Sequence, residues 1–345
     1  DLSYREQMAA KAFRYTAYYD ALIAEYFNNR LSVSAPEYVS MSYRLGTSLR
    51  YGENPHQNAA FYEKVYEENP AEWKQLHGKE LSYNNYTDMY NAVRFVKEFS
   101  EPAVVGTKHN NPAGIGIGET IDEAFDKAYA CDATSLFGGI FALNRPVTKH
   151  IAEVLHSFFM EIVIAPEYEE EALSILEEKK NLRVIVMPNL STFSLPKKTV
   201  KEVLGGILVQ DYDNADLTEE MEVVSARKPT EEEMRDLLFG FKAVKMVASN
   251  GAVLVKDGAT LGIGQGQVRR TWAVEDALSH GEGKHSGAVL ASDGFFFADT
   301  VELLQKHGIR AAIQPGGSVK DPEVIELCNQ YGIALVMTHI RHFRH

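Results

Sequence analysis

Cysteine is scarce in this chain of 345 residues, which contains only Cys131 and Cys328. Two thiols cannot build a disulfide framework, and the absence of a CxxC motif or a Cys-His cluster excludes a structural zinc site. A reducing cytoplasm suits such a chain, so we predict a cytoplasmic location. Long apolar runs are also missing, because Glu161 interrupts the best one, near residues 158–164. We therefore expect neither a membrane span nor a signal peptide.

Positive charge is in short supply as well. The chain has 35 Lys and Arg against 48 Asp and Glu, which gives a formal net charge of −13. Such a chain repels phosphate backbones at long range, so nucleic-acid binding is disfavoured. Any small anionic ligand must be held by cations that cluster locally. The length and the 45% hydrophobic content are those of a globular protein with about two domains.

Short β-rich runs alternate with helical stretches after about residue 100. This rhythm predicts layered α/β/α sheets. The expected strands are 103–107, 162–165, 182–187, 253–256, 288–291, 311–314 and 334–338. The expected helices are about 121–130, 169–180, 231–248, 300–307 and 322–331, and several of them begin at a capping residue.

The N-terminus predicts one long helix over residues 1–30. Ser3 and Glu6 have the spacing of a capping box, and Asn28 and Asn29 are expected to end the helix. A helix of this length needs a surface to pack on. We expect core packing, with a position across a domain or subunit boundary as the alternative. The weakly patterned stretch 188–230 is expected to connect two domains.

Polar, cationic and glycine residues follow four of the predicted strands. In open α/β sheets ligands bind beyond the carboxyl ends of strands, so these segments are candidates for the site. They are 108–114, 292–297, 314–318 and 338–345. Lys108 and His109 form the sharpest pair, since they offer a fixed cation beside a base that titrates near neutrality. A surface dipeptide is the alternative interpretation.

Three further patterns leave alternatives open. The terminal RHFRH at 341–345 is either a frayed tail or a binder of phosphate or a planar anion, and metal binding is disfavoured because no Asp or Cys has suitable spacing. The glycine-rich stretch 261–267 lacks the context of a dinucleotide fingerprint, so its glycines are expected to permit close backbone approach to a ligand or another strand. Phe295, Phe296 and Phe297 belong either to the core or to a surface that stacks on a flat heterocycle.

Eight motifs, taken in order, resemble those of the AICAR transformylase/IMP cyclohydrolase family, the bifunctional enzymes of purine biosynthesis. They extend over nearly the whole chain. They are LRYGENPHQ at 49–57, KELSYNNYTD at 79–88, KHNNPAG at 108–114, FGG at 137–139, SNGAVLVKDGATLGIGQGQVRR at 249–270, SDGFFFAD at 292–299, IQPGGS at 313–318 and the terminal RHFRH.

The resemblance implies a fold of duplicated three-layer α/β/α subdomains similar to cytidine deaminase. It places a connector helix at 1–30, the first subdomain at 31–205 and the second at 206–345. The family's N-terminal cyclohydrolase domain has no counterpart in these residues, so the resemblance implies formyl transfer and not ring closure, although the full-length parent is expected to be an IMP cyclohydrolase too. The ligand signature of zinc deaminases, an HxE motif together with PCxxC, is missing, so no zinc is expected.

The activity implied is transfer of the formyl group of 10-formyltetrahydrofolate to the 5-amino group of AICAR, which gives FAICAR on the way to IMP. His109 matches the family's base or proton shuttle, and Lys108 matches a residue that stabilises the transition state. Asn250 matches a residue that orients the carboxamide of the nucleotide, and His345 lies near that group in the family. Two rival interpretations are a degraded module for nucleotide binding or dimerisation, and an amidohydrolase or deaminase.

The resemblance also implies the binding residues. Arg50, Tyr51 and Arg341 match residues that hold the nucleotide, and either Lys179 or Lys180 adds charge. The remaining candidates are Phe137, Gly138, Arg270, Asp293, Phe295, Asp299, Ser318 and Phe343. A homodimer with shared active sites is implied, and a monovalent cation near Asp293 is left open. The folate loop, SDGFFFAD, is one residue shorter than is common in the family, with Gly294 in place of Ala and no Pro.

Overall fold

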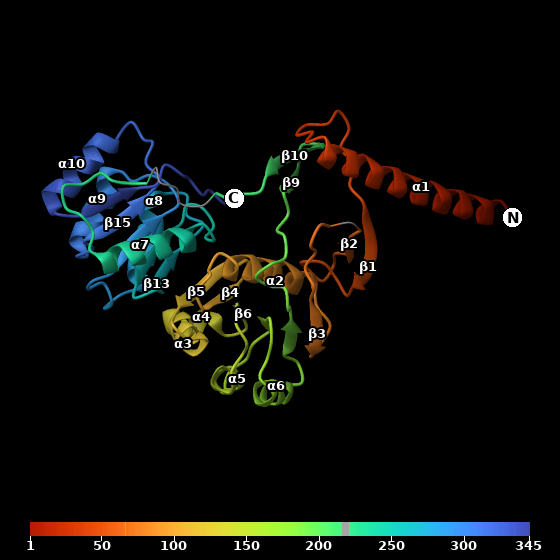
Figure 1. Ribbon diagram of the computed structural model, residues 1–345, viewed down its shortest axis with the longest axis horizontal. Coiled ribbons are helices and arrows are strands. Elements are labelled where there is room, and N and C mark those ends of the chain that lie inside the picture. Colours follow the sequence, from red (N-terminus) through yellow and green to blue (C-terminus); the bar gives the residue numbers. More distant parts are fainter. Residues whose placement is uncertain (66, 216–220) are drawn as a thin grey trace. The chain divides into compact units, whose positions relative to one another are not determined.

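The computed structural model describes residues 1–65, 67–215 and 221–345 (Figure 1). The chain divides into two compact units, each described here by itself. Unit 1 comprises Asp1–Pro70 and Leu81–Asn84, and unit 2 comprises Ala71–Glu80 and Asn85–His345. The proposed subdomain boundaries at 30/31 and 205/206 stay predictions. No helix within the described residues is long and apolar enough to cross a membrane.

Unit 1 consists of a long helix and a hairpin. Helix α1 (Leu2–Arg30) confirms the predicted N-terminal helix, but its cap is Asp1, whose side chain accepts the Ser3 N–H at 3.2 Å. The expected cap at Ser3 is thus two residues too late. The hairpin pairs β1 (Tyr43–Leu49) with β2 (Ala59–Lys64), and an ion pair of 3.2 Å between Lys64 and Glu25 ties it to the helix.

Helix α1 buries none of its residues. Its large apolar side chains face solvent, with Leu2, Phe13 and Tyr15 each more than 70% exposed. The expectation that this helix packs into a core is therefore wrong for this chain. Exposed apolar surface of this extent is typical of a helix that docks against another protein surface.

Unit 2 is built on a sheet of twelve strands within the described residues. Its order is β11-β16-β15-β14-β12-β13-β5-β4-β6-β7-β8-β3. The first half of the sheet contains β3 (Lys74–His77), β4 (Ala103–Lys108), β5 (Asn111–Ile117), β6 (Ile140–Leu143), β7 (Ile162–Ala165) and β8 (Arg183–Val186). The second contains β11 (Glu222–Val223), β12 (Ala252–Lys256), β13 (Ala259–Gly264), β14 (Val289–Ser292), β15 (Ala311–Gln314) and β16 (Ala334–Met337).

The two halves have the same topology. Each starts with an antiparallel hairpin, β4–β5 or β12–β13, and continues through an antiparallel strand into two parallel ones. An antiparallel edge strand closes each half, β3 in the first and β11 in the second. The halves meet where β13 pairs with β5, with Ala259 opposite Gly116. This arrangement confirms the predicted α/β class.

Helices cover both halves of the sheet (Figure 1). They are α2 (Tyr83–Val96), α3 (Ile121–Cys131), α4 (Ala133–Leu136), α5 (Lys149–His156), α6 (Glu170–Glu177), α7 (Glu231–Val244), α8 (Arg270–His280), α9 (Ala298–Lys306) and α10 (Asp321–Tyr331). In the second half, Leu254 and Leu290 point into the core formed with α8, α9 and α10. Gly240 of α7 packs close to Val255 and Ala291 instead, so α7 covers the opposite face.

Glycines let strand β13 lie directly on helix α8. A Cβ on Gly264 would stand 1.8 Å from the Ala273 carbonyl oxygen, and one on Gly262 would stand 2.0 Å from that of Ala277. The stretch 261–267 was predicted to approach a ligand or another strand, and these two glycines instead permit close approach to a helix. The stretch contributes to β13, which packs against α8.

The stretch 188–230 is more ordered than its sequence predicts. It contains a hairpin of β9 (Lys198–Val203) and β10 (Gly206–Asp211) together with β11, while 216–220 lie outside the described residues. Neither hairpin strand buries a residue, which is why no buried-strand pattern marks them.

Candidate functional site

Lys108 ends β4, and His109 begins the tight hairpin turn that connects β4 to β5. Lys108 pairs with Asn111, which leaves His109 and Asn110 as the two turn residues. Their φ angles are +53° and +64°, a combination that type I′ hairpin turns require and that glycine and asparagine adopt most easily. A histidine with positive φ is uncommon, and such conformations cluster at functional sites. The turn leaves the His109 side chain exposed.

The Lys108 ammonium turns back toward the segment that precedes β6. Its Nζ donates to the Phe137 carbonyl oxygen at 2.8 Å. Gly138 follows with φ +74°, and its N–H donates to the Phe159 carbonyl at 2.8 Å. The structure therefore brings Lys108, Phe137 and Gly138, three of the predicted site residues, together at one end of the first half of the sheet.

In the second half of the sheet, the site contains a buried ion pair. Arg270, the first residue of α8, is 8% exposed, and Asp293, just after β14, is 0% exposed. Arg270 Nη1 donates to Asp293 Oδ1 and to the Gly251 carbonyl, and Nη2 donates to Asn250 Oδ1 at 2.6 Å. Two buried charges that satisfy each other in this way fix the orientation of the Asn250 amide.

Asn250 is held from its other side as well. Its Nδ2 donates to the Gln267 carbonyl at 2.7 Å, and its backbone N–H donates to the same oxygen at 3.0 Å. Ala248, two residues before it, donates its N–H to Asn111 Oδ1 at 3.2 Å. This bond connects the segment of Asn250 to the first residue after the His109 turn.

The C-terminal segment is anchored, which removes the frayed-tail alternative. The Arg344 guanidinium donates to the Met246 and Asn110 carbonyls at 2.6 and 2.8 Å, and its backbone N–H donates to Ser249 Oγ at 3.0 Å. Burial lowers the pKa of Arg344 to about 10, so the side chain is still a cation at neutral pH. Arg344 thus joins the His109 turn to the segment of Asn250, and the ring of the neighbouring His345 lies 5.5 Å from that of Phe343.

A cavity of about 340 Å³ opens next to this network. Phe295 and Phe297 lie on one side of it with their rings edge to face at 5.5 Å, whereas Phe296 is fully buried in the core. The core interpretation is thus right for Phe296, while stacking of Phe295 and Phe297 on a heterocycle stays a prediction. The cavity is lined by Asn250, Val268, Arg269, Arg270, Thr271, Phe295, Phe297, Asp299 and Phe343, which include five predicted site residues.

Asp299 offers the cavity an unused acceptor. Its Oδ2 pairs with Arg269 at 3.3 Å, while its Oδ1 is buried and has no partner among the described residues. A buried oxygen without a donor is costly, so a ligand N–H at this position would be stabilising.

Glycine is the only residue type that fits at position 294, between Arg270 and Phe343. A Cβ at this position would stand 2.3 Å from Arg270 Nη2 and 2.9 Å from a Phe343 ring carbon. The departure from the family's alanine is therefore matched to the way these two side chains pack in this chain.

We expect Gly294→Ala to destabilise the protein by about 1–3 kcal/mol, because overpacking forces the buried Arg270 or Phe343 to move. Urea unfolding of the variant measures the loss. Gly206→Ala is the control, because a Cβ there meets only one atom, at 3.8 Å. Equal stability of the two variants would contradict the packing argument.

Two more candidates lie at the ends of the neighbouring parallel strands. After β15, the N–H groups of Gly317 and Ser318 donate to one oxygen of Asp321, at 2.8 and 3.1 Å. After β16, the Arg341 guanidinium stacks over the Phe343 ring at 4.3 Å. Because β14, β15 and β16 are parallel, these segments share one edge of the sheet with Asp293.

Arg50 and Tyr51 belong to unit 1, where they follow β1. The Arg50 guanidinium carbon lies 5.5 Å from the centre of the Tyr51 ring. Their predicted part in holding a nucleotide stays a prediction. Lys179 is occupied by three backbone carbonyls, those of Leu155, His156 and Phe158, at the end of α5. Of the two lysines proposed to add charge, Lys180 is the exposed one.

Three residues that build the site were not predicted from the sequence. Arg344 stood in the terminal cluster without being singled out, and Gln267 was hidden in the glycine-rich stretch. Asp88 stood in a motif, yet nothing in its spacing indicates that it reaches the His109 turn, where it accepts the Asn110 N–H at 2.6 Å. No group of three or more His, Cys, Asp or Glu in the described part of the chain is arranged to hold a metal ion.

The chain is similar to known proteins over nearly its whole length. Over residues 1–280 the chain matches the family described as AICARFT/IMPCHase bienzyme. It is 51% identical to the bifunctional purine biosynthesis protein PurH of Oceanobacillus iheyensis, over 99% of this chain and 68% of that protein. The proteins of the same name from Anoxybacillus flavithermus and Caldicellulosiruptor saccharolyticus are both 50% identical, over 100% and 99% of this chain and 68% and 67% of theirs. The resemblance carried by the eight motifs is thereby confirmed, and the chain belongs to the AICARFT/IMPCHase bienzyme family.

Proposed function

We propose that this chain is an AICAR formyltransferase of purine biosynthesis. It would move the formyl group of 10-formyltetrahydrofolate to the 5-amino group of AICAR and release FAICAR and tetrahydrofolate. The relatives named above are bifunctional purine biosynthesis proteins, which supports the pathway. The proposal concerns formyl transfer alone, the half of the family's chemistry to which the site residues correspond.

One observation carries the proposal. Lys108 and His109 from the first half of the sheet and Asn250 from the second are held in one network through Arg344, which bonds to Asn110 and to Ser249. These residues lie far apart in the sequence. A cation, a base and an oriented amide in one place are what attack by a weak amine on a formyl carbon requires.

The proposed chemistry assigns each group one task. The 5-amino nitrogen attacks the formyl carbon of the donor, and His109 accepts the proton that this nitrogen loses. The Lys108 ammonium stabilises the negative charge that develops on the formyl oxygen. The bond from the formyl carbon to the donor nitrogen then breaks, and the donor nitrogen takes up a proton. Asn250, fixed by Arg270 and Gln267, would orient the carboxamide beside the reacting amine.

The cavity suits a flat ligand that carries N–H groups. Phe295, Phe297 and Phe343 offer aromatic surfaces for a heterocycle, and Asp299 Oδ1 offers an unused acceptor. Its volume of about 340 Å³ lies at the lower end of the range for small-molecule sites. We assign this cavity to the folate co-substrate, and Arg341 and Arg50 to the phosphate of the nucleotide, because guanidinium groups pair well with phosphate.

We further propose a homodimer, supported by the unburied apolar side chains of α1. Analytical ultracentrifugation of the purified chain is expected to give twice the monomer mass. Replacing the exposed Phe13 and Tyr15 with aspartate should shift the equilibrium toward monomer, because these rings would lose their apolar contacts. A wild-type chain that stays monomeric at micromolar concentration would contradict the dimer.

The direct test is turnover by the purified chain. With AICAR and 10-formyltetrahydrofolate, the proposal expects tetrahydrofolate to appear in step with FAICAR. AICAR binding without turnover would support the alternative, a degraded nucleotide-binding or dimerisation module, for which the shortened folate loop is the supporting observation. Release of ammonia without use of the folate would support an amidohydrolase or deaminase.

A further inference from the structure

A carboxylate side chain holds the turn that contains His109. Asp88, on α2, accepts the Asn110 N–H at 2.6 Å, and the backbone N–H of His109 also lowers the pKa of this carboxyl group. Two successive turn residues thus act on one side chain. The proposed chemistry gives Asp88 no task, and it stands 21 residues before His109 in the sequence.

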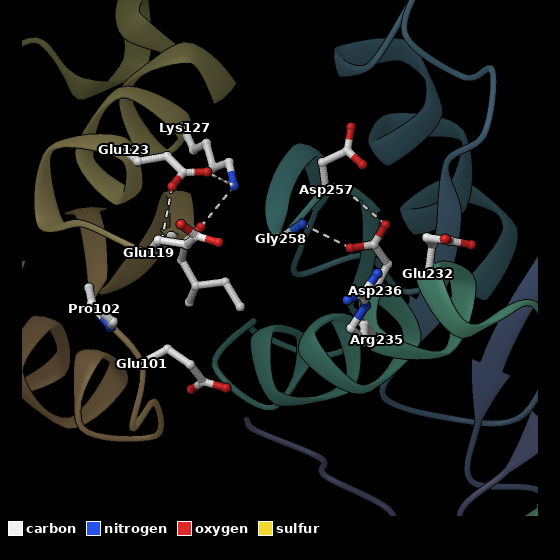
Figure 2. A pocket seen from close by; sticks show the side chains of 12 residues that line it. Glu101, Pro102, Glu119, Glu123, Lys127, Glu232, Arg235, Asp236, Asp257 and Gly258 are labelled. Carbon is white, nitrogen blue, oxygen red and sulfur yellow. Dashed lines mark hydrogen bonds and ion pairs between the residues drawn. The ribbon is translucent and has the colours of Figure 1, made fainter.

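The second half of the sheet contains the same clamp without a histidine. Figure 2 shows Asp236 of α7 bonded to the turn between β12 and β13, where its two oxygens accept the N–H groups of Asp257 and Gly258 at 2.9 and 2.8 Å. Asp88 and Asp236 each lie five residues after the first residue of their helix, Tyr83 and Glu231. The duplicated fold has therefore placed one carboxylate at each of two equivalent turns.

The two turns differ in what they need from the clamp. In the second half, Asp257 and Gly258 adopt φ angles of +54° and +69°, which aspartate and glycine tolerate well. In the first half the same geometry falls on His109 and Asn110, so this turn contains no glycine. Because residues with a Cβ adopt positive φ less readily than glycine, the Asp88 clamp stabilises a conformation that is more costly here than in the second half.

The charges around Asp88 agree with this arrangement. Burial raises the pKa of Asp88, while the N–H groups of the turn and a charge on His109 lower it. Glu161, the other acidic group that acts on it, raises it. The cations next to the turn are Lys108, whose ammonium is turned toward Phe137, and Arg344, which bonds to the Asn110 carbonyl.

We propose that Asp88 is a positioning residue for formyl transfer, which holds His109 in the turn conformation that points its imidazole at the reacting amine. This inference rests on the proposed function. Asp88 does not touch the substrate in this account and acts only through the backbone of His109 and Asn110.

Asp236→Asn is the matched control for Asp88→Asn, because it weakens the same clamp at a turn outside the site. We expect Asp88→Asn to lower kcat by about 10- to 100-fold with KM for AICAR nearly unchanged, since small misplacements of a catalytic group have effects of this size. Asp236→Asn should leave kcat within about twofold of wild type. Hydrogen exchange should rise at the amides of residues 109 and 110 in the first variant and of 257 and 258 in the second.

A double variant separates positioning from a general loss of structure. If Asp88 acts through His109, adding Asp88→Asn to His109→Asn lowers kcat no further, because the group to be positioned is gone. Multiplying effects, or a normal kcat for Asp88→Asn with raised exchange at 109 and 110, would overturn the inference. If hydrogen exchange shows that the asparagine still holds the turn, Asp88→Ala takes the place of Asp88→Asn in the same comparison. A wild-type chain without turnover would instead defeat the proposed function itself.

Discussion

Replacing His109 with asparagine is expected to lower kcat for formyl transfer by about 10²- to 10⁴-fold, the usual contribution of a general base. Asparagine is the informative substitution because it tolerates the φ of +53° at this position. The turn should therefore persist while the base is lost. Steady-state rates of tetrahydrofolate formation measure the effect, and AICAR affinity by calorimetry should change little.

The interpretation of that variant depends on the turn staying intact. An unchanged urea midpoint together with a collapsed kcat would assign the loss to the imidazole. A variant that retains more than about a tenth of the wild-type rate would show that His109 is not the base, since general base catalysis is worth at least a hundredfold.

Replacing Arg270 with methionine is expected to cost about 3–5 kcal/mol of folding free energy, because it leaves the fully buried Asp293 carboxylate without its cation. The same change frees the Asn250 amide, to which Arg270 donates at 2.6 Å. We therefore expect a second effect, a fall in kcat in the fraction of protein that stays folded. Urea unfolding and steady-state kinetics measure the two losses separately.

Arg269 provides the neighbouring control. Its ion pair with Asp299 is exposed, with 59% and 46% of the two side chains accessible, and such pairs are worth about 0–1 kcal/mol. Arg269→Met should thus cost little stability. Similar losses for the two methionine variants would mean that the buried pair does not organise the site.

Most strands of the parallel core could be predicted from the sequence. The strands 162–165 and 311–314 have the predicted bounds, and the capping box of Thr230 and Glu233 starts α7 as expected. These elements were predictable because their signals are local: a short apolar run between polar segments, or a cap next to a helix. The site residues were predicted because the motifs resemble those of the family, and not from geometry.

What the sequence could not predict depends on contacts between distant segments. The strand β5 was interpreted as a polar loop because Asn111, Pro112 and Ala113 carry no strand signal, and only pairing with β4 and β13 makes them one. The positive φ of His109 is set by that pairing and by Asp88 together. The exposure of α1 could not be predicted either. A helix with apolar residues has the same sequence pattern whether it packs on the core of its own chain or on another protein surface.

The duplicated fold explains why the site lies where it does. The candidate site and the cavity of about 580 Å³ in Figure 2 adjoin equivalent hairpins, β4–β5 and β12–β13. The cavity in Figure 2 is lined by six carboxylates and only two cations, Lys127 and Arg235. An anionic nucleotide would be repelled there, whereas Lys108 and Arg344 would attract it at the candidate site. Charge thus distinguishes two places that the backbone makes alike.

A single-turnover experiment with the formyl carbon of the donor labelled with ¹³C tests the central claim most directly. The chain is present in molar excess over AICAR, and the mass of the product is measured by mass spectrometry. The account predicts that AICAR gains one labelled formyl group in the wild-type chain and almost none in His109→Asn over the same time. Unlabelled AICAR recovered from a folded wild-type chain that binds both ligands would contradict it.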